Sequence, residues 1–371
     1  MIPIYIPYLE KYKSSAIKAI EDNWISNHGI YVSLAAELLQ KRLNVKYCIL
    51  MNNGTSATHC LYKALKYKYP DIKKIYIPNN VFVAPWNCGL YEYDEGVFEV
   101  MKIDENTCNI DTSEKYFNTL EDNSAVIIVH NLGNIVNVPR LKKIRPDLIF
   151  IEDNCEGMFG KYEDIFSGMS ESSLCSSCSF YGNKIITTGE GGGFITQDKD
   201  VYNYIKSVYS QGMTETKFLH DKKAYNYRMT NIEAGFLLAQ LEDIDTILKR
   251  RYEIFEIYDN LFTELANNKK VKLITHKENT KYAPWIYAIH ILNNNTSITE
   301  KIKFFSVNNV DIRPFFYPIN SHEHLKTIYN DDHVSYKLNS EVILIPSSTN
   351  ITFDEQKYVV DIVSKFVSKT V

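Results

Sequence analysis

The chain has 371 residues, of which 45% are hydrophobic and 23% are charged, and its formal net charge is −4. This is the composition of an ordinary globular protein that is long enough for a large core and two domains. Mild acidity without a run of lysine or arginine argues against a nucleic acid or an anionic membrane surface as partner, so a small molecule is the expected ligand.

The amino-terminal segment, MIPIYIPYLEKYKSS, has no basic stretch followed by an apolar run and a small-residue cleavage site. No apolar run along the chain reaches membrane-spanning length. The seven cysteines are an odd number, and Cys175 with Cys178 lacks a second pair of metal ligands at suitable spacing. We therefore expect a cytoplasmic protein with reduced thiols and no metal site.

Short apolar runs that end in polar residues alternate with helical patterns in the first half of the chain. Buried strands are expected at residues 47–51, 74–78, 125–130, 148–153 and 192–197. Residues 173–180, SLCSSCSF, are expected to form a further strand of small residues, and residues 55–68 place their apolar side chains on one helical face. The alternation predicts an α/β sheet covered on both sides, with sites at the carboxyl ends of its strands.

The segment NNGTSATHC follows the first strand and begins a helix. Gly54 lets the backbone approach a ligand closely, and the free amides at Thr55 and Ser56 suit a phosphate group. The alternative is an ordinary helix cap, which serine and threonine favour in any case.

Asp153, in IEDNCEG, is expected at the end of a strand, where a carboxylate often serves as a cap or an ion-pair partner. A carboxylate that faces a heteroaromatic nitrogen has another effect, because a nearby anion favours the protonated ring. A protonated ring is an electron sink. Asp153 is thus a candidate for this second role.

Lys184 lies in SFYGNKIITTGEGGG, five residues after Ser179 and ahead of a glycine cluster. A lysine in apolar surroundings loses its proton readily, as a nucleophilic amine must; the alternative is a surface loop after a strand. A phosphate cradle, a carboxylate and a lysine are together the groups that pyridoxal phosphate requires.

From Thr230 the pattern changes to one long helical stretch, residues 230–265, opened by Thr230 and Glu233 as a capping box. Such a helix can leave one domain and enter another. We expect a large domain at residues 1–246, with an amino-terminal arm, and a smaller α+β domain at residues 247–371.

Six segments occur in the order found in one family: NNGTSA, FVAPWN, IEDNCEGMFG, SFYGNKIITTGEGG, NYRMTNIEAGFLLAQL and DIRPFFYP. Over nearly its whole length the chain resembles the DegT/DnrJ-type nucleotide-sugar aminotransferases. The resemblance implies the aspartate-aminotransferase-like fold of pyridoxal-phosphate enzymes (fold type I). In that fold the large domain has a mixed, mostly parallel sheet, and a smaller α+β domain follows.

The resemblance also implies roles for the cofactor residues. Lys184 matches the lysine that binds pyridoxal 5′-phosphate as a Schiff base, and Asp153 matches the carboxylate that faces the pyridine nitrogen. Ser179 matches the phosphate-binding serine, and Gly54 with Thr55 matches the phosphate-binding turn. These roles are the ones that the chemistry of the phosphate cradle, the carboxylate and the lysine had already indicated.

Further positions match residues around the cofactor and at a subunit contact. Phe82 matches an aromatic ring over the cofactor, and Glu156 matches a polar position near the ring substituents. Asn226 matches a residue that reaches the phosphate from the neighbouring subunit, which implies a symmetric homodimer with composite sites. Arg228 either binds substrate or orders the dimer contact.

Two residues of DIRPFFYP are candidates for the sugar side of the site. Arg313 is suited to the substrate's diphosphate, because a guanidinium pairs well with phosphate oxygens; a salt bridge with a nearby carboxylate is the alternative. Tyr317, with Phe315 and Phe316, belongs either to a sugar platform or to the core.

The implied reaction moves an amine from glutamate, through the pyridoxamine form of the cofactor, to carbon 4 of a nucleotide-linked 4-keto-6-deoxyhexose. The motifs are most similar to perosamine and viosamine synthases, which serve polysaccharide biosynthesis such as that of O-antigen. Amination at carbon 3 is the nearest alternative. Sugar dehydratases of this fold carry histidine where this chain has Lys184, and a non-catalytic binding module would be expected to have lost the lysine, the aspartate or the phosphate anchor.

Overall fold

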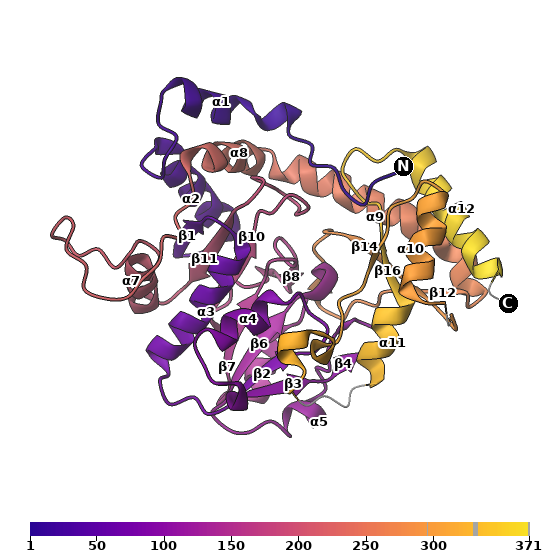
Figure 1. Ribbon diagram of the computed structural model, residues 1–371, viewed down its shortest axis with the longest axis horizontal. Helices are drawn as coiled ribbons and strands as arrows, with labels where there is room; N and C mark the ends of the chain where they lie inside the picture. Colours follow the sequence, from indigo (N-terminus) through magenta and orange to yellow (C-terminus); the bar gives the residue numbers. More distant parts are fainter. Residues whose placement is uncertain (295, 329–332, 370–371) are drawn as a thin grey trace.

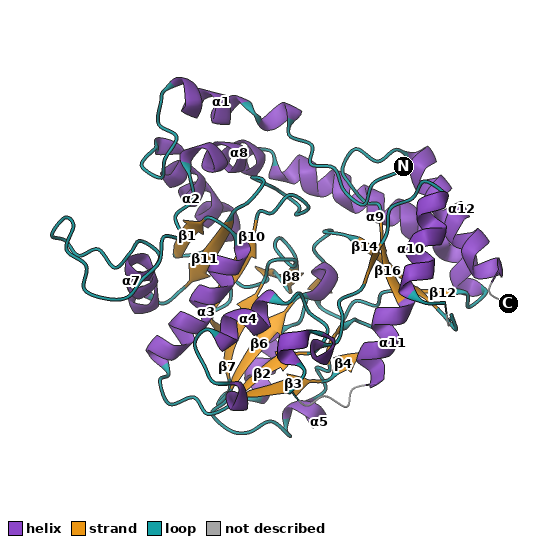
Figure 2. Ribbon diagram, in the orientation of Figure 1, coloured by secondary structure: helices purple, strands orange, loops and turns teal. Residues whose placement is uncertain are grey.

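The computed structural model describes residues 1–294, 296–328 and 333–369. A seven-stranded sheet and a four-stranded sheet each have a separate set of helices, and helix α9 runs from the end of α8 to the four-stranded sheet (Figure 1). Figure 2 shows the larger sheet enclosed by helices, with the smaller sheet on the side where the two termini lie.

The central sheet has the order β1-β11-β10-β7-β6-β2-β3. In that order its strands are Tyr47–Met51, Gly192–Thr196, Ser173–Ser179, Ile149–Asp153, Ala125–Val129, Ile75–Pro78 and Phe98–Met101. Strand β11 alone runs antiparallel, to both β1 and β10, so the sheet is mixed and mostly parallel. The predicted strands and fold class are confirmed, whereas the edge strand β3 was not predicted from the sequence.

Helices cover both faces of this sheet. The large-sheet helices are α1 (Ser14–Glu21), α2 (Ile30–Leu43), α3 (Gly54–Lys68), α4 (Ala84–Leu90), α5 (Glu114–Phe117), α6 (Val138–Ile144), α7 (Lys199–Val208) and α8 (Asn231–Glu242). Helix α3 packs across β10, β11 and β7, which puts its first turn at the carboxyl ends of the parallel strands. Two apolar clusters, one on each face, bury the sheet, as its near-continuous apolar strands require.

The predicted capping box is present: the Thr230 hydroxyl accepts from the Glu233 amide, and the Glu233 carboxylate accepts from the Thr230 amide. The prediction of one uninterrupted helix is wrong. The stretch divides at Asp243 into α8 and α9 (Ile244–Asn267), because Asp243 leaves helical geometry and its carboxylate accepts hydrogen bonds from Lys11 and Tyr12 of the arm. The predicted domain boundary at residue 246 stays a prediction.

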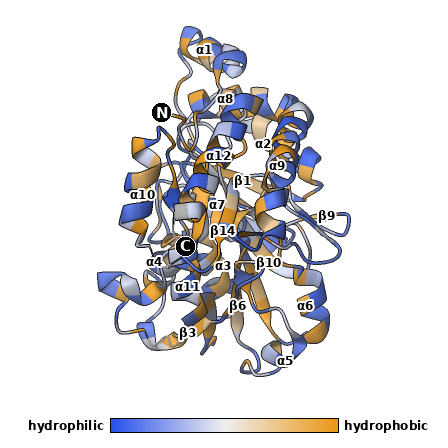
Figure 3. Ribbon diagram, turned by 90° about the vertical axis from the view of Figure 1, so that its right-hand side faces the viewer, coloured by the Kyte–Doolittle hydropathy of each residue, from blue (hydrophilic) through white to orange (hydrophobic). Residues whose placement is uncertain are grey.

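The second sheet is antiparallel, with the order β12-β14-β16-β15. Its strands are Val271–Leu273, Tyr287–Ile291, Val342–Ile345 and Arg313–Pro314, and its helices are α9, α10 (Ile298–Val307), α11 (His333–Glu341) and α12 (Phe353–Lys369). A third apolar cluster fills the space between this sheet and its helices. In Figure 3 the strands are mainly hydrophobic, while peripheral helices such as α10 alternate hydrophilic and hydrophobic residues.

Smaller elements connect these layers. They are β4 (Ile103–Asp104) with β5 (Asn109–Ile110), a three-stranded sheet of β13 (Thr280–Lys281), β8 (Lys161–Tyr162) and β9 (Ile165–Phe166), and the 3₁₀ turns Glu10–Tyr12, Glu95–Val97, Asn131–Gly133, Ile319–Ser321 and Glu323–Leu325. The arm joins the second sheet's layer through Ile2, whose amide donates to Asn309 O at 2.7 Å. Among the helices of the described residues, none is both long and apolar enough to cross a bilayer.

Candidate active site

Asp153 is the last residue of β7, the central strand of the seven-stranded sheet. Its side chain is buried, and each carboxylate oxygen has one neutral donor: the Cys155 amide at 3.0 Å from Oδ1 and the Thr58 hydroxyl at 3.2 Å from Oδ2. Both oxygens keep lone-pair capacity for a further donor. The carboxylate is therefore available to a protonated ring nitrogen.

The first turn of α3 forms the second part of the site. Asn53 caps the helix by accepting from the Ser56 amide at 2.8 Å, so the amides of Gly54 and Thr55 precede the capped part of the turn. The predicted amide of Ser56 is thus engaged by the cap. The remaining amides and the positive end of α3 are suited to a phosphate group.

Gly54 lies directly against Ser179, the last residue of β10. A Cβ atom built on Gly54 would be 2.8 Å from Ser179 Cβ and 3.0 Å from its Oγ. Only glycine permits this approach. The helix turn and the serine hydroxyl are thus adjacent, and together they offer donors of the kind that a phosphate group accepts from.

Lys184 lies in the turn that follows β10, where its amide donates to Tyr181 O at 2.9 Å. Its amine is 4.0 Å from the centre of the Trp285 ring. A small cavity contacts Lys184, Ser179 and Cys155, and a second cavity of about 200 Å³ lies between the same turn, the arm and α9. Space therefore exists beside this lysine on both sides of the turn.

Glu156 shares the small cavity with Lys184. Burial raises the pKa of Glu156 to about 7, while the Lys184 charge and the Leu132 amide, which donates to Oε2 at 2.9 Å, lower it in part. Leu132 has a φ of 58°, in the left-handed region that costs a branched residue energy. The loop thus holds Leu132 in a strained conformation in which the Leu132 amide donates to Glu156.

Cys155 lies in the same pocket, and its sulfur is 3.7 Å from Ser177 Oγ. Burial raises the pKa of the Cys155 thiol well above its usual range, so this group is an uncharged neighbour and not a nucleophile at neutral pH.

Phe82 and the DIRPFFYP segment meet at the edge of the site. The Phe82 ring, 56% exposed, lies edge-on to Phe316 with 6.4 Å between ring centres, and Asn80 Nδ2 donates to Phe316 O at 2.7 Å. Phe315 is fully buried and belongs to the core, whereas Tyr317 is 43% exposed. Of the three aromatic residues, Tyr317 has the exposed ring that a substrate contact needs.

Arg313 forms an ion pair with Asp311 and donates to Ile312 O at 2.9 Å. The salt bridge weighed as the alternative for Arg313 is thus present. Its side chain is 54% exposed, so the guanidinium keeps donors that face solvent.

Asn226 and Arg228 belong to the segment between α7 and α8, part of which projects from the body (Figure 1). Asn226 is exposed and pairs with Ser210, while Arg228 Nη1 donates to Ser210 Oγ at 3.2 Å. Between them, Tyr227 O accepts from the Asn52 amide at 2.9 Å, which fixes this segment beside the end of β1.

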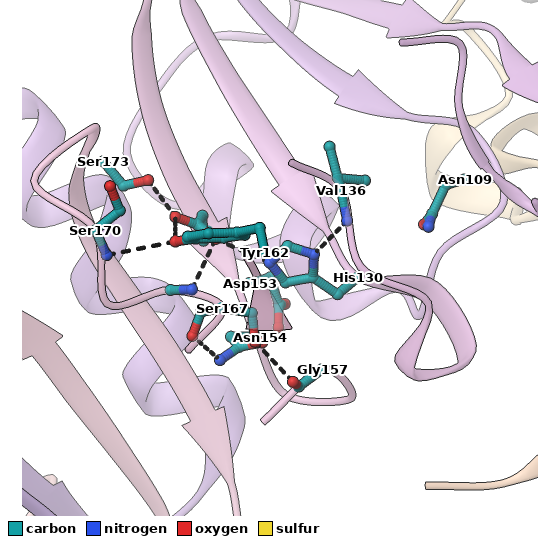
Figure 4. Close-up of polar contacts among 12 residues, drawn as sticks. Asn109, His130, Val136, Asp153, Asn154, Gly157, Tyr162, Ser167, Ser170 and Ser173 are labelled. Atoms are coloured by element: carbon teal, nitrogen blue, oxygen red, sulfur yellow. Dashed lines mark hydrogen bonds and ion pairs between the residues drawn. The ribbon is translucent and has the colours of Figure 1, made fainter. Parts of the chain in front are cut away.

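A buried polar network adjoins Asp153 in the chain (Figure 4). The amide of Val136 donates to His130 Nδ1 at 3.1 Å, so Nε2 carries the proton and donates to Glu152 Oε2 at 2.8 Å. Glu152 also accepts from the Gly168 amide and from Ser173. This network fixes the loop that carries Leu132. It was not predicted from the sequence, although a second acidic residue, Glu152, inside an apolar strand indicated a buried polar partner.

Thr58, Trp285 and Arg251 were also missed. Thr58 lies one helical turn after Gly54, a spacing that points it toward the strand ends. Nothing local in the sequence brings Trp285 and Arg251 to Lys184. Within the described ranges, no group of three or more histidine, cysteine, aspartate or glutamate side chains is arranged to hold a metal ion.

The comparisons with known proteins agree with this geometry. The model of the DegT/DnrJ/EryC1/StrS aminotransferase family matches residues 8–364. The chain is 28% identical over 372 residues to the GDP-perosamine synthase of Escherichia coli O157:H7 and 29% identical over 387 residues to that of Vibrio cholerae, with 99% of each chain covered in both cases.

Solved structures share the fold. The Helicobacter pylori aminotransferase PseC, involved in the biosynthesis of pseudoaminic acid, has a TM-score of 0.86 at 20% identity, covering 99% of both chains. The E. coli GDP-4-keto-6-deoxy-D-mannose-3-dehydratase with bound hydrated pyridoxal phosphate has a TM-score of 0.87 at 19% identity, covering 98% of this chain and 99% of that one. The chain therefore belongs to the DegT/DnrJ/EryC1/StrS aminotransferase family, and its cofactor is pyridoxal phosphate.

Proposed function

We propose that the protein is a cytoplasmic homodimer that transfers the amine of glutamate to carbon 4 of a nucleotide-linked 4-keto-6-deoxyhexose. The product is a nucleotide 4-amino-4,6-dideoxy sugar of the perosamine type, used in polysaccharide biosynthesis such as that of O-antigen. The full-length similarity to GDP-perosamine synthases supports carbon 4 and a GDP carrier.

The observation that carries the proposal is that four groups lie close together at the carboxyl ends of the parallel strands. Gly54 touches Ser179, Asp153 is bonded to Thr58 on the same helix as Gly54, and Lys184 shares a cavity with Ser179. The groups come from α3, β7, β10 and the turn after β10. This set supplies an anchor, a ring partner and an amine at once.

Pyridoxal phosphate, when bound, supplies an electron sink conjugated to the carbon–nitrogen bond that exchanges its amine. Gly54, Thr55 and Ser179 bind its phosphate, and Asp153 holds a proton at the pyridine nitrogen, since an anion stabilises the charged ring. Phe82 would lie over the ring, and Lys184 would supply the amine that holds the cofactor covalently.

Two residues act on protons and ring substituents. The Lys184 amine would move the proton from the α carbon of glutamate to the cofactor, and in the second half-reaction it would move a proton from the cofactor to carbon 4 of the sugar. Glu156 donates or accepts at the ring oxygen substituent, and its pKa of about 7 suits either state at neutral pH.

The substrate contacts belong to exposed residues. Arg313 exchanges Asp311 for the substrate's diphosphate, and Tyr317 contacts the sugar. Asn226 and Arg228 act across the dimer contact, a role for which the exposed Asn226 and the half-buried Arg228 are suited.

The test combines labelling and product analysis. Holoenzyme reduced with borohydride is expected to carry the cofactor on Lys184, as shown by the mass of that peptide, and Lys184→Ala is expected to be inactive. With ¹⁵N-glutamate, a panel of GDP, UDP and dTDP 4-keto-6-deoxyhexoses should give one labelled amino sugar, with nitrogen on carbon 4 by NMR. A labelled product formed only from the corresponding 3-keto sugars, tested in parallel, would correct the position alone. Loss of a hydroxyl without nitrogen would establish a dehydratase, and full activity of Lys184→Ala would refute the mechanism.

A further inference from the structure

The amine of Lys184 is held by an aromatic ring. Its nitrogen is 4.0 Å from the centre of the Trp285 ring, and the indole is 5% exposed. At this distance an ammonium group is attracted by the negative face of the indole, and burial strengthens the attraction.

The orientation of the ring is fixed by the same turn that carries the lysine. Trp285 Nε1 donates to Asn183 O at 2.9 Å, and Asn183 directly precedes Lys184. Any shift of the turn therefore shifts the ring with it. The lysine and its aromatic contact move as one unit, although 101 positions separate Lys184 from Trp285 in the chain.

Arg251, on α9, fastens the main chains of both residues. Its Nη1 donates to Trp285 O at 2.8 Å and to Pro284 O at 3.3 Å, and its Nη2 donates to Lys184 O at 3.3 Å. The guanidinium thus connects helix α9 with two other segments, namely the turn that carries Lys184 and the residues just before β14. Its planar, forked donors are suited to holding several carbonyls in fixed relation.

Arg251 forms no ion pair with any residue that the structure describes. Burial lowers the pKa of Arg251 to about 10 with no opposing contribution from a described carboxylate, and Nε has no partner among the described residues. The guanidinium remains charged at neutral pH. Burying an unpaired charge costs free energy. The contacts that offset this cost are the hydrogen bonds of Arg251 to three main-chain carbonyls, whose relative position they fix.

We propose that Trp285 is a positioning residue, which holds the Lys184 amine against its indole ring whenever the lysine is not bonded to the cofactor. Arg251 keeps the main chains of Trp285 and Lys184 in a fixed relative position. The inference rests on the proposed role of Lys184 as the cofactor lysine. A free lysine side chain has several rotatable bonds and would otherwise sample many positions. The indole face attracts the lysine side chain but forms no ion pair or covalent bond with it. The side chain is therefore kept close to the cofactor and can leave the ring to react.

The experiment measures attachment of pyridoxal phosphate to Lys184 in cofactor-free protein, by borohydride reduction at timed points and peptide mass. Trp285→Leu removes the ring face, Trp285→Tyr keeps an aromatic face, and Arg251→Met removes the guanidinium. Trp86→Leu is the control for a buried indole, since Trp86 Nε1 donates to Pro78 O at 3.1 Å. Arg145→Met is the control for a buried arginine that binds carbonyls, those of Phe117 and Leu120.

We expect attachment to slow about tenfold in Trp285→Leu and in Arg251→Met, and to stay within about threefold of wild type in Trp285→Tyr. The controls are expected to unfold at lower temperature but to react at the wild-type rate, which separates positioning from stability. Trp285→Leu should lower the single-turnover rate of both half-reactions and the steady-state kcat, with little change in KM for glutamate.

Wild-type attachment rates in Trp285→Leu, with Lys184 labelled in the wild type, would overturn the inference and leave the proposed function intact. Absence of label on Lys184 in the wild type would instead overturn the proposed function. If Trp285→Leu does not fold, Trp285→Met takes its place, and the same comparison with Trp285→Tyr decides the outcome.

Discussion

The hydroxyl of Thr58 donates to Oδ2 of Asp153 across 3.2 Å, and the same oxygen of Thr58 is 3.0 Å from Ser177 Oγ. Thr58 lies on α3, one turn beyond Gly54, so a single rigid helix carries both the phosphate cradle and a partner of the carboxylate. In the proposed cofactor site, the phosphate cradle and the donor to the ring partner are therefore held in fixed relation by one helix.

Thr58→Val tests this relationship. The replacement keeps the shape but leaves Oδ2 of a buried carboxylate without its donor, which costs about 1–3 kcal/mol. We expect a lower free energy of unfolding and weaker binding of pyridoxal phosphate, measured by denaturant titration and by absorbance titration. Thr58→Ser keeps the hydroxyl and should behave as wild type; equal cofactor affinity in the valine variant would contradict the link.

Gly54→Ala tests the cradle. The new Cβ would be 2.8 Å from Ser179 Cβ, so either the helix turn or β10 must shift, at a cost of about 1–3 kcal/mol. We expect cofactor affinity to fall by about tenfold or more, because the amides move away from the phosphate. Gly96→Ala is the matched control, since a Cβ there meets no atom within 4 Å. Equal affinities in the two alanine variants would refute the role of Gly54.

Glu156 predicts a pH dependence of stability in the cofactor-free protein. Its folded pKa of about 7 is raised from the ordinary 4.5, so the folded state binds a proton that the unfolded state releases between these values. The free energy of unfolding should therefore fall as pH rises from about 4.5 to 7, by about 3 kcal/mol from this group alone.

Glu156→Gln removes this titration and keeps an oxygen for the Leu132 amide. We expect the variant to gain stability over the wild type at pH 8 but not at pH 5, as measured by thermal unfolding. Glu37→Gln, at an exposed position of α2, should show the same difference at both pH values. A parallel pH profile for Glu156→Gln and the wild type would rule out the buried carboxyl as its source.

The proposed composite site of a homodimer predicts complementation between two inactive variants. Lys184→Ala lacks the proposed cofactor lysine, and in the proposed dimer Asn226→Asp would place a carboxylate near the phosphate of the neighbouring subunit, where like charges repel. Mixed after unfolding and refolding, the two should form hybrid dimers with one intact site each, and about a quarter of wild-type activity should return. If activity stays at the level of the separate variants, Asn226 acts within its own subunit.

The buried strands and the amphipathic helix of residues 55–68 were predictable, because continuous apolar runs and 3.6-residue periodicity are local properties. The capping box at Thr230 was predictable for the same reason. The break at Asp243 was not, since it depends on Lys11 and Tyr12, more than 200 residues away in the chain. Arg313 was left with two roles, and its pairing with Asp311 became evident only in the folded chain.

The sequence by itself determined the family, the α/β sheet and the chemical types at the site: the lysine, the carboxylate, the serine and the glycine, each at the end of a predictable element. Only the tertiary structure decided what surrounds them. Trp285 under the Lys184 amine, Thr58 on Asp153 and the strained Leu132 amide on Glu156 are contacts between segments far apart in sequence. Such contacts are fixed by the packing of whole elements against one another, and no local pattern encodes them.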